Sequence, residues 1–271
     1  MPPWLQVSRG GAPLLLSIPH SGTDIPPELA TGLASAWLAR SDTDWWVDRL
    51  YGFAGALDAT VVRTALSRTV IDANRDPGGA SLYPGRSTTG LCPTTTFDGA
   101  PLYQAGAGPD PGAIDARRRA YFQPYHEALV AELHRLRAQH PRVVLYDCHS
   151  IRSRVPRLFE GELPQFNLGT NDGASCAPEL SRAVAAVCGA GPWSCVVNGR
   201  FKGGYITRHY GRPDAGVHAL QMELACRGYL DEPEHVTPDT WPPPYDEARA
   251  APLQVLLRRV LLACLDFARG A

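Results

Sequence analysis

The run Arg142-Val-Val-Leu-Tyr-Asp-Cys148 constrains the fold of this chain more than any other feature. It is rich in β-branched and aromatic residues and reads as a buried strand. Residues 14–18, a short apolar run stopped by Pro19, and residues 60–63 carry the same signal. We therefore expect a sheet whose inner strands are buried.

Helical patterns lie between these strands. They are predicted for residues 44–57, 114–139, 178–188 and 246–268, and further strands for residues 69–72 and 193–198. Residues 217–223 fit a strand or a helix, and residues 76–110 form a long irregular segment rich in Gly, Pro, Ser and Thr. Strands alternating with helices indicate one α/β domain over residues 1–271, with a mixed, mostly parallel sheet flanked by helices.

Composition and charge exclude several classes of protein. The chain has 271 residues and a formal net charge of −1, which argues against a nucleic-acid partner. No export signal opens the chain and no apolar run is long enough to cross a bilayer, so we expect a cytoplasmic protein without a membrane partner. The 7 cysteines are scattered without a CxxC pair, which favours reduced thiols over a structural zinc site. The sequence leaves the oligomeric state open.

Two histidines follow strongly predicted strands. His20 comes after the strand at residues 14–18, and His149 after the strand at residues 142–148. Active sites of such sheets lie beyond the carboxyl ends of the strands, so the two imidazoles meet if the strands are neighbours. Imidazole is a favoured zinc ligand, and a catalytic zinc site takes three protein ligands. The pair therefore predicts a metal site.

The third ligand is expected to be a carboxylate. Asp24, Asp42 and Asp44 are the nearby candidates. Asp44 stands at the predicted start of the helix after the His20 loop, from where its side chain can face the edge of the sheet. We expect Asp44 to be the ligand and keep Asp24 as the alternative.

The residues around His149 differ in the face they present. Side chains alternate along a strand, so Asp147 shares a face with His149 and Cys148 points the other way. We expect Asp147 to orient a metal ligand. A Cys148–His149 nucleophilic pair is disfavoured for the same reason, and Ser150 lacks the G-x-S-x-G motif of a serine hydrolase.

These residues resemble the zinc carboxypeptidase and aspartoacylase group and, more closely, the N-formylglutamate amidohydrolase family. In the carboxypeptidases the acidic ligand belongs to a His-x-x-Glu motif, and Thr23 occupies the Glu position here. The closer resemblance runs in order from about residue 14 to residue 231. It is carried by Ile18-Pro-His-Ser-Gly22, Thr43-Asp44, Asp72-Ala-Asn-Arg-Asp-Pro77, Thr88-Thr-Gly-Leu-Cys-Pro-Thr-Thr-Thr-Phe-Asp98, Asp147-Cys-His-Ser150, Asn167-Leu-Gly-Thr170, Phe201-Lys-Gly-Gly-Tyr205 and Glu223.

The resemblance implies an activity and a role for several residues. It implies zinc-dependent hydrolysis of N-formyl-L-glutamate to formate and glutamate, the last step of a histidine degradation route. Glu223 matches the family's catalytic carboxylate, which acts as general base. Asn74 and Arg75 match a pair that grips substrate.

Formyl-glutamate has two carboxylates, so a second cation is needed besides Arg75. Lys202, which is the one lysine of the chain, and Arg208 are the first candidates, followed by Arg152 and Arg86. A different divalent ion could occupy the same ligands. The alternatives are a zinc amidohydrolase for another N-acyl amino acid or acyl-peptide, a hydrolase using Ser150 or Cys148, and a catalytically silent binding protein.

Overall fold

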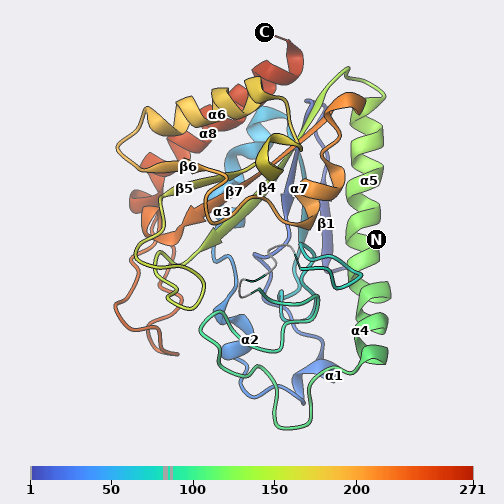
Figure 1. The fold of residues 1–271 in the computed structure, drawn as a ribbon, viewed down its shortest axis with the longest axis vertical. Coiled ribbons are helices and arrows are strands. Elements are labelled where there is room, and N and C mark those ends of the chain that lie inside the picture. The colour runs from blue at the N-terminus through green and yellow to red at the C-terminus, as the bar shows by residue number, and fades with distance from the viewer. Residues whose placement is uncertain (1, 82–84, 86–87, 271) are drawn as a thin grey trace.

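The computed structural model describes residues 2–81, 85 and 88–270, and these residues build a sheet between layers of helices (Figure 1). The strand order is β1-β3-β2-β4-β7-β5-β6. The pairs β1–β3 and β5–β7 are antiparallel, and the other four neighbouring pairs are parallel. The strands are β1 (Leu5–Ser8), β2 (Leu14–Ile18), β3 (Thr60–Thr64), β4 (Val143–Ile151), β5 (Phe166–Gly169), β6 (Cys195–Val197) and β7 (Val217–Ala225).

The long helices cover the two faces of this sheet. In Figure 1, α6 and α8 lie on one side and α5 on the other, while irregular chain and the short helices α1 and α2 gather below the sheet. The helices are α1 (Pro27–Ala30), α2 (Leu38–Ser41), α3 (Val47–Leu50), α4 (Pro111–Arg117), α5 (Gln123–Arg137), α6 (Pro178–Gly189), α7 (Tyr205–Tyr210) and α8 (Glu247–Arg269). The α/β class and the mixed, mostly parallel sheet flanked by helices are confirmed.

Alternation along β4 divides the core into two layers. Tyr146 and Cys148 pack into the cluster that contains the buried residues of α6 and α8. Val143 and Leu145 pack into the cluster that contains the buried residues of α5. Each layer removes apolar surface from water, which is the main favourable term in folding.

The α5 face of the sheet changes character toward the carboxyl ends of β4 and β7. Leu145 and Ala219 are apolar and packed, whereas Asp147 and His149 on β4 and Glu223 on β7 continue the same face as polar groups. Because side chains repeat every two residues along a strand, this switch places several polar groups side by side. The fold thereby builds a polar site at one end of a buried sheet.

Most of the expected elements are present. The strands at residues 14–18 and 60–63 and the strand ending near Cys148 are confirmed, and residues 217–225 form a strand. The expected long helix runs over residues 111–137 as α4, a π-helical turn and α5. The other two expected helices are α6 and α8.

Two expectations about local structure are wrong. Residues 69–72 form no strand, because their backbone is bonded by other partners: Arg117 Nη1 donates to Val70 O, and Asp72 N donates to Leu91 O. The helix expected over residues 44–57 is interrupted. It comprises α3 and a 3₁₀ segment, and Trp46 before α3 has a left-handed backbone conformation with φ 63°.

Two further expectations concern the loops and the membrane. Within residues 76–110, the part that the structure describes is irregular, apart from isolated bridges. Among the described helices, none has both the length and the apolar character needed to cross a bilayer.

Candidate metal and catalytic site

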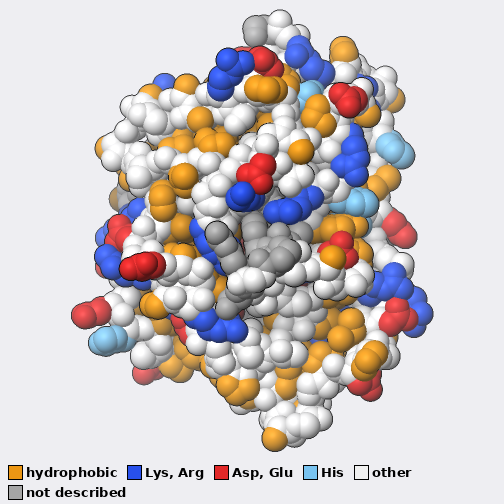
Figure 2. All heavy atoms as spheres, viewed as in Figure 1, with side chains coloured by type: hydrophobic (Ala, Val, Ile, Leu, Met, Phe, Trp, Pro, Cys, Tyr) orange, Lys and Arg blue, Asp and Glu red, His pale blue; other side chains and the backbone are white. Residues whose placement is uncertain are grey.

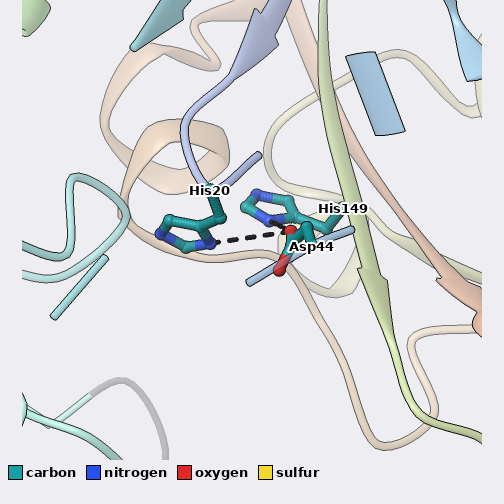
Figure 3. A group of neighbouring side chains, drawn as sticks. All are labelled: His20, Asp44 and His149. Atoms are coloured by element: carbon teal, nitrogen blue, oxygen red, sulfur yellow. Dashed lines mark hydrogen bonds and ion pairs between the residues drawn. The ribbon is translucent and has the colours of Figure 1, made fainter. Parts of the chain in front are cut away.

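His20, Asp44 and His149 form a buried group at the end of the sheet (Figure 3). His20 follows β2, Asp44 precedes α3, and His149 lies within β4. One ligand atom from each residue lies within 4.8 Å of the others. β2 and β4 are neighbours, as the pairing of the two imidazoles requires. The expectation that His149 follows its strand is wrong by a few residues, since β4 extends to Ile151.

Each imidazole also contacts a buried carboxylate through its other nitrogen. His20 Nε2 lies 2.8 Å from Asp72 Oδ1, and His149 Nε2 lies 2.9 Å from Asp147 Oδ2. A carboxylate accepts the Nε2 hydrogen, which leaves Nδ1 as the free lone pair of the ring. In both residues this Nδ1 is the nitrogen nearer Asp44, at 3.7 Å from Asp44 Oδ2 in His20 and 2.9 Å in His149.

The chemistry of this group fits a divalent metal ion. His20 Nδ1 and Asp44 Oδ1 are buried without a hydrogen-bond partner, which is costly for polar atoms unless a cation occupies the site. Asp44, Asp72 and Asp147 are all buried here, whereas Arg68 is the buried guanidinium beside them. A bound divalent ion would offset the remaining negative charge, and His, His and carboxylate form a donor set typical of catalytic zinc.

The carboxylates also shift the pKa values of the group. Burial alone would raise the pKa of Asp44, but its hydrogen bond with His149 and the nearby imidazole of His20 hold it below the ordinary value. Burial alone would lower the pKa of His149, and Asp147 and Asp44 raise it well above the ordinary value. A proton held among these groups competes with a metal ion, because metal ligands must be deprotonated.

Glu223 lies beside this group on β7. It is the direct cross-strand partner of His149, and both side chains line one pocket. Its side chain is buried, which raises its pKa to about 8. Gln221 Nε2 donates to Glu223 Oε2 at 3.1 Å. A buried carboxyl group at this position can exchange protons with molecules in the pocket.

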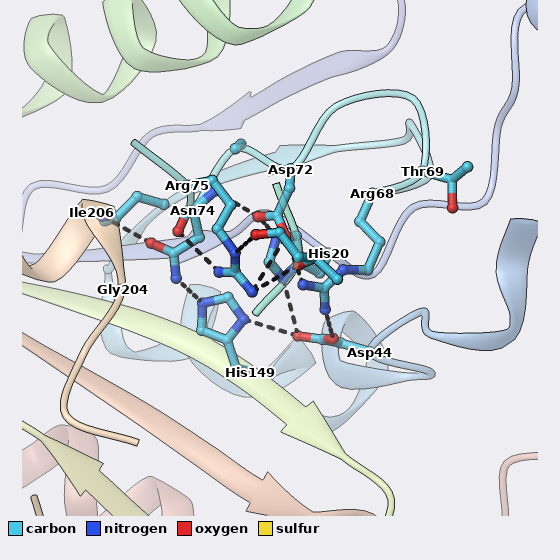
Figure 4. A network of polar contacts seen from close by, with 12 residues as sticks. His20, Asp44, Arg68, Thr69, Asp72, Asn74, Arg75, His149, Gly204 and Ile206 are labelled. Carbon is cyan, nitrogen blue, oxygen red and sulfur yellow. Dashed lines mark hydrogen bonds and ion pairs between the residues drawn. The ribbon is translucent and has the colours of Figure 1, made fainter. Parts of the chain in front are cut away.

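Asn74 is placed in the network behind the imidazoles (Figure 4). Its Oδ1 accepts from Ile206 N at 2.8 Å, and its Nδ2 lies 2.9 Å from both Asp147 Oδ2 and His149 Nε2. The side chain reaches the pocket wall, but its polar atoms contact groups of the protein itself. The geometry therefore supports a positioning role more directly than the expected contact with substrate.

The expected cations divide into those that line the pocket and those that do not. Arg75 lines the pocket, and its Nε donates a hydrogen bond to Thr89 O at 3.0 Å. Lys202 forms an ion pair with Asp172 at 3.0 Å, and Arg208 Nε donates to Gly203 O at 2.8 Å. Neither Lys202 nor Arg208 is among the described lining residues of the pocket. Arg152 pairs with Asp98 at 2.5 Å. Arg86 lies outside the described residues.

Three charged or amide side chains of the described lining escaped the sequence-based prediction: Arg68, Arg200 and Gln221. Arg68 pairs with Asp72 at 2.7 Å, and Arg200 Nε donates to Leu158 O at 2.8 Å. Arg68 belongs to no motif of the sequence, and Arg200, although it begins the stretch 200–209, does not stand out in a chain rich in arginine. Gln221 could have been found, since it stands two residues before Glu223 and shares its face if the segment is a strand.

The other candidates lie elsewhere. Asp24 is exposed and its backbone bonds to Ala65 and Ser67, while Asp42 Oδ2 accepts from Phe97 N at 2.7 Å. Cys148 is buried in the opposite core layer, where burial raises the pKa of its thiol well above the ordinary value. Ser150 Oγ accepts from Tyr229 at 2.7 Å. Neither side chain is part of the described lining of the pocket.

Comparison with known proteins identifies the family. Residues 12–230 match the family model for N-formylglutamate amidohydrolase. The chain is 49% identical to N-formylglutamate deformylase of Pseudomonas aeruginosa over 229 residues, which is 84% of this chain and 86% of that protein. It is 45% identical to N-formylglutamate deformylase of Pseudomonas putida over 262 residues, which is 96% of this chain and 95% of that protein.

A solved structure gives the same result. The crystal structure of N-formylglutamate amidohydrolase from Ralstonia eutropha JMP134 superposes with a TM-score of 0.77 at 25% sequence identity, covering 98% of this chain and 99% of that chain. The matched segment includes His20, Asp44, His149 and Glu223. This chain belongs to the N-formylglutamate amidohydrolase family.

Proposed function

We propose that this chain is a metal-dependent hydrolase that converts N-formyl-L-glutamate and water to formate and L-glutamate. The observation that carries the proposal is one pocket lined by His20, His149 and Glu223, with the buried carboxylate of Asp44 next to both imidazoles. Relatives at 45% and 49% identity bear the name N-formylglutamate deformylase, which supports this choice of substrate.

We assign the metal to His20, Asp44 and His149. Bound there, a divalent ion acts as a Lewis acid that polarises an amide carbonyl and acidifies water. Zinc suits two imidazoles and a carboxylate, and Mn²⁺ or Co²⁺ are alternatives because affinity alone does not decide the metal used in the cell. Asp72 and Asp147 contact Nε2 of the two imidazoles, which would leave Nδ1 of each ring available to the ion.

Glu223 moves the proton in the reaction. Its carboxylate takes a proton from the attacking water, and the oxygen of that water bonds to the formyl carbon. When the C–N bond breaks, Glu223 returns the proton to the departing amine nitrogen. The products are formate and glutamate with its free amine, and no other reactant is consumed. The close placement of Glu223 and His149 across the β4–β7 ladder supports this role.

Two arginines are suited to the two carboxylates of the substrate. Arg75 and Arg200 both line the pocket, and internal hydrogen bonds fix both side chains. A guanidinium can bind a carboxylate through two parallel N–H groups. We therefore assign the carboxylates to Arg75 and Arg200. Lys202 and Arg208 are not among the described lining residues and are weaker candidates.

Substitution distinguishes these cations. Arg200→Met is expected to lower kcat/KM for N-formyl-L-glutamate by about tenfold to a hundredfold, which is the value of a hydrogen bond to a charged group. Lys202→Met serves as the matched control and is expected to change kcat/KM by less than about twofold, as is usual for exposed ion pairs. Steady-state kinetics measure both values. A larger loss of kcat/KM in Lys202→Met than in Arg200→Met would assign the substrate carboxylate to Lys202 instead.

The proposal includes the cytoplasm as the location and histidine degradation as the route that supplies the substrate. The stretches Gly90-Leu-Cys-Pro93 and Arg200-Phe-Lys-Gly-Gly-Tyr-Ile-Thr-Arg-His209, which resemble the histidine-degradation branch of the family, support that route.

A substrate panel tests the proposed activity. Purified protein supplied with zinc is incubated with N-formyl-L-glutamate, N-formyl-L-aspartate and N-acetyl-L-glutamate, and release of the free amine is measured. We expect the largest kcat/KM for N-formyl-L-glutamate. A larger value for another substrate would assign the same site to a different N-acyl amino acid. Absence of activity on all three would reject the proposed substrate class.

A further inference from the structure

Gln221 is a buried amide on β7, two residues before Glu223 and on the same face of the strand. We propose that Gln221 is a positioning residue, which holds the Glu223 carboxylate toward the metal group by donating a hydrogen bond to it. This inference rests on the proposed function, because it assigns to Gln221 a role that acts through the general base.

The orientation of the Gln221 amide follows from its neighbours. Gly204 N donates to Gln221 Oε1 at 2.7 Å, so the oxygen of the amide is the atom that faces Gly204. The NH₂ group must then face the other way, where Glu223 Oε2 lies 3.1 Å from Gln221 Nε2. A backbone N–H, which can only donate, thus fixes which end of the amide meets the carboxylate.

Asn74 repeats this arrangement on the metal side of the pocket. Ile206 N donates to Asn74 Oδ1 (Figure 4), and Asn74 Nδ2 donates to Asp147 Oδ2. Asn74 Nδ2 also lies 3.3 Å from Gln221 Oε1, which connects the two amides. Residues 204–206 therefore orient both amides, one toward the carboxylate that holds His149 and one toward Glu223.

The close approach of residue 204 to the Asn74 amide requires glycine. A Cβ atom on Gly204 would lie 2.4 Å from Asn74 Nδ2 and 2.5 Å from Asn74 Oδ1. Packing of this kind leaves the Asn74 amide little freedom to rotate. A general base held in one orientation loses no time or free energy to reorientation before it accepts a proton. The network therefore ties the base and a metal ligand to the same short backbone segment.

Two substitutions separate a positioning role from a purely structural one. Gln221→Met removes both polar atoms at similar length. Gln221→Glu keeps an acceptor for Gly204 N but replaces the donor beside Glu223 with a second carboxyl oxygen. If Gln221 serves only to accept from Gly204, the Glu variant retains wild-type kcat. If it donates to Glu223, both variants lose kcat by about tenfold to a hundredfold while KM changes by less than about threefold.

The decisive measurement is a double-mutant cycle with Glu223→Gln. Because Gln221 acts through Glu223, adding Gln221→Met to Glu223→Gln is expected to change kcat by less than about twofold. An equal loss in both backgrounds would overturn the inference. Gln139→Glu, at an exposed position after α5, controls for the added charge. Metal content and urea unfolding of every variant show whether the site and the fold are retained.

A readout without catalysis completes the test. In crystals of the metal-free proteins, the Glu223 side chain is expected in one orientation in the wild type and in more than one in Gln221→Met. A single unchanged orientation together with unchanged kcat would refute the positioning role. An inactive wild-type protein would instead count against the proposed function, and the crystallographic comparison would still decide whether Gln221 holds Glu223.

Discussion

His20 and His149 show how single atoms decide what this site can bind. Nε2 of each ring contacts a buried carboxylate, so that Nδ1 is the nitrogen that remains available as a ligand beside Asp44. Side-chain carboxylates are common partners of metal-binding histidines, because they fix the tautomer and raise the basicity of the ring. The metal proposal therefore depends as much on Asp72 and Asp147 as on the three ligands.

Removing the base without removing the metal is the first test at this scale. Glu223→Gln keeps the size of the side chain and is expected to lower kcat by about a hundredfold or more, which is within the range for loss of a general base. The bound metal should be unchanged, because Glu223 is not one of the three ligands. Formate release and metal analysis are measured on the same preparation, with Glu28→Gln on exposed α1 as control. Full activity would exclude Glu223 as the base.

His126 gives a prediction about stability. It is buried between Ala73 O, 2.9 Å from its Nε2, and the hydroxyl of Tyr210, and burial lowers its pKa to about 3. The unfolded chain binds this proton near pH 6.5, so the contribution to stability is complete above pH 6.5 and is lost as the pH falls toward 3.

His126→Gln retains a donor and an acceptor but cannot titrate. Between pH 7.5 and pH 5, the free energy of unfolding of the wild type is expected to fall by about 2 kcal/mol more than that of the variant. Urea unfolding at the two pH values measures this difference. An equal change in both proteins would mean that His126 is not held neutral in the folded state.

Much of the metal group could be predicted at the residue scale, because strand ends and alternation are local properties. His20, Asp44 and His149 are brought together by the structure as expected. The roles of Arg68 and Arg200 depend on contacts between segments far apart in the chain, such as that of Arg200 with Leu158, which no local pattern encodes. The same holds for the internal contacts of Asn74 with Ile206 and Asp147.

At the scale of elements, strands with a strong apolar pattern were predictable, and segments shaped by their neighbours were not. Val143–Ile151 is fully buried, so its β-rich composition and its environment agree. Residues 69–72 have a similar composition, but their backbone groups form hydrogen bonds with Arg117 and Leu91 instead of with a neighbouring strand. Tertiary context overrides β propensity in this way because the propensity mostly reflects packing.

The start of α7 gives a prediction for an element. Gly204→Ala would place a methyl group within about 2.5 Å of the Asn74 amide, so Asn74 must move away from Asp147 and Gln221. We expect a loss of about 1–3 kcal/mol in the free energy of unfolding and a lower kcat. Gly189→Ala, near the end of α6, is the control, because nothing lies within 4 Å of its added Cβ. Equal behaviour of the two variants would contradict the close packing described for Gly204.

At the scale of the whole molecule, the sheet separates apolar packing from chemistry. Both faces of β4 are packed near its start, and toward its end the α5 face carries Asp147 and His149. Figure 2 shows Lys and Arg side chains around the middle of one face of the molecule, which suits an anionic substrate. The fold thus combines a rigid apolar interior with a charged site at one end of the sheet.

The most direct test of the central proposal is to measure bound metal and formate release in the same samples. Protein stripped with a chelator is titrated with zinc, and N-formyl-L-glutamate hydrolysis is followed at each step. We predict no activity in the metal-free protein and a linear rise that saturates at one ion per chain, with no recovery in His20→Ala or His149→Ala. Undiminished formate release from protein shown to be free of metal would contradict the proposal.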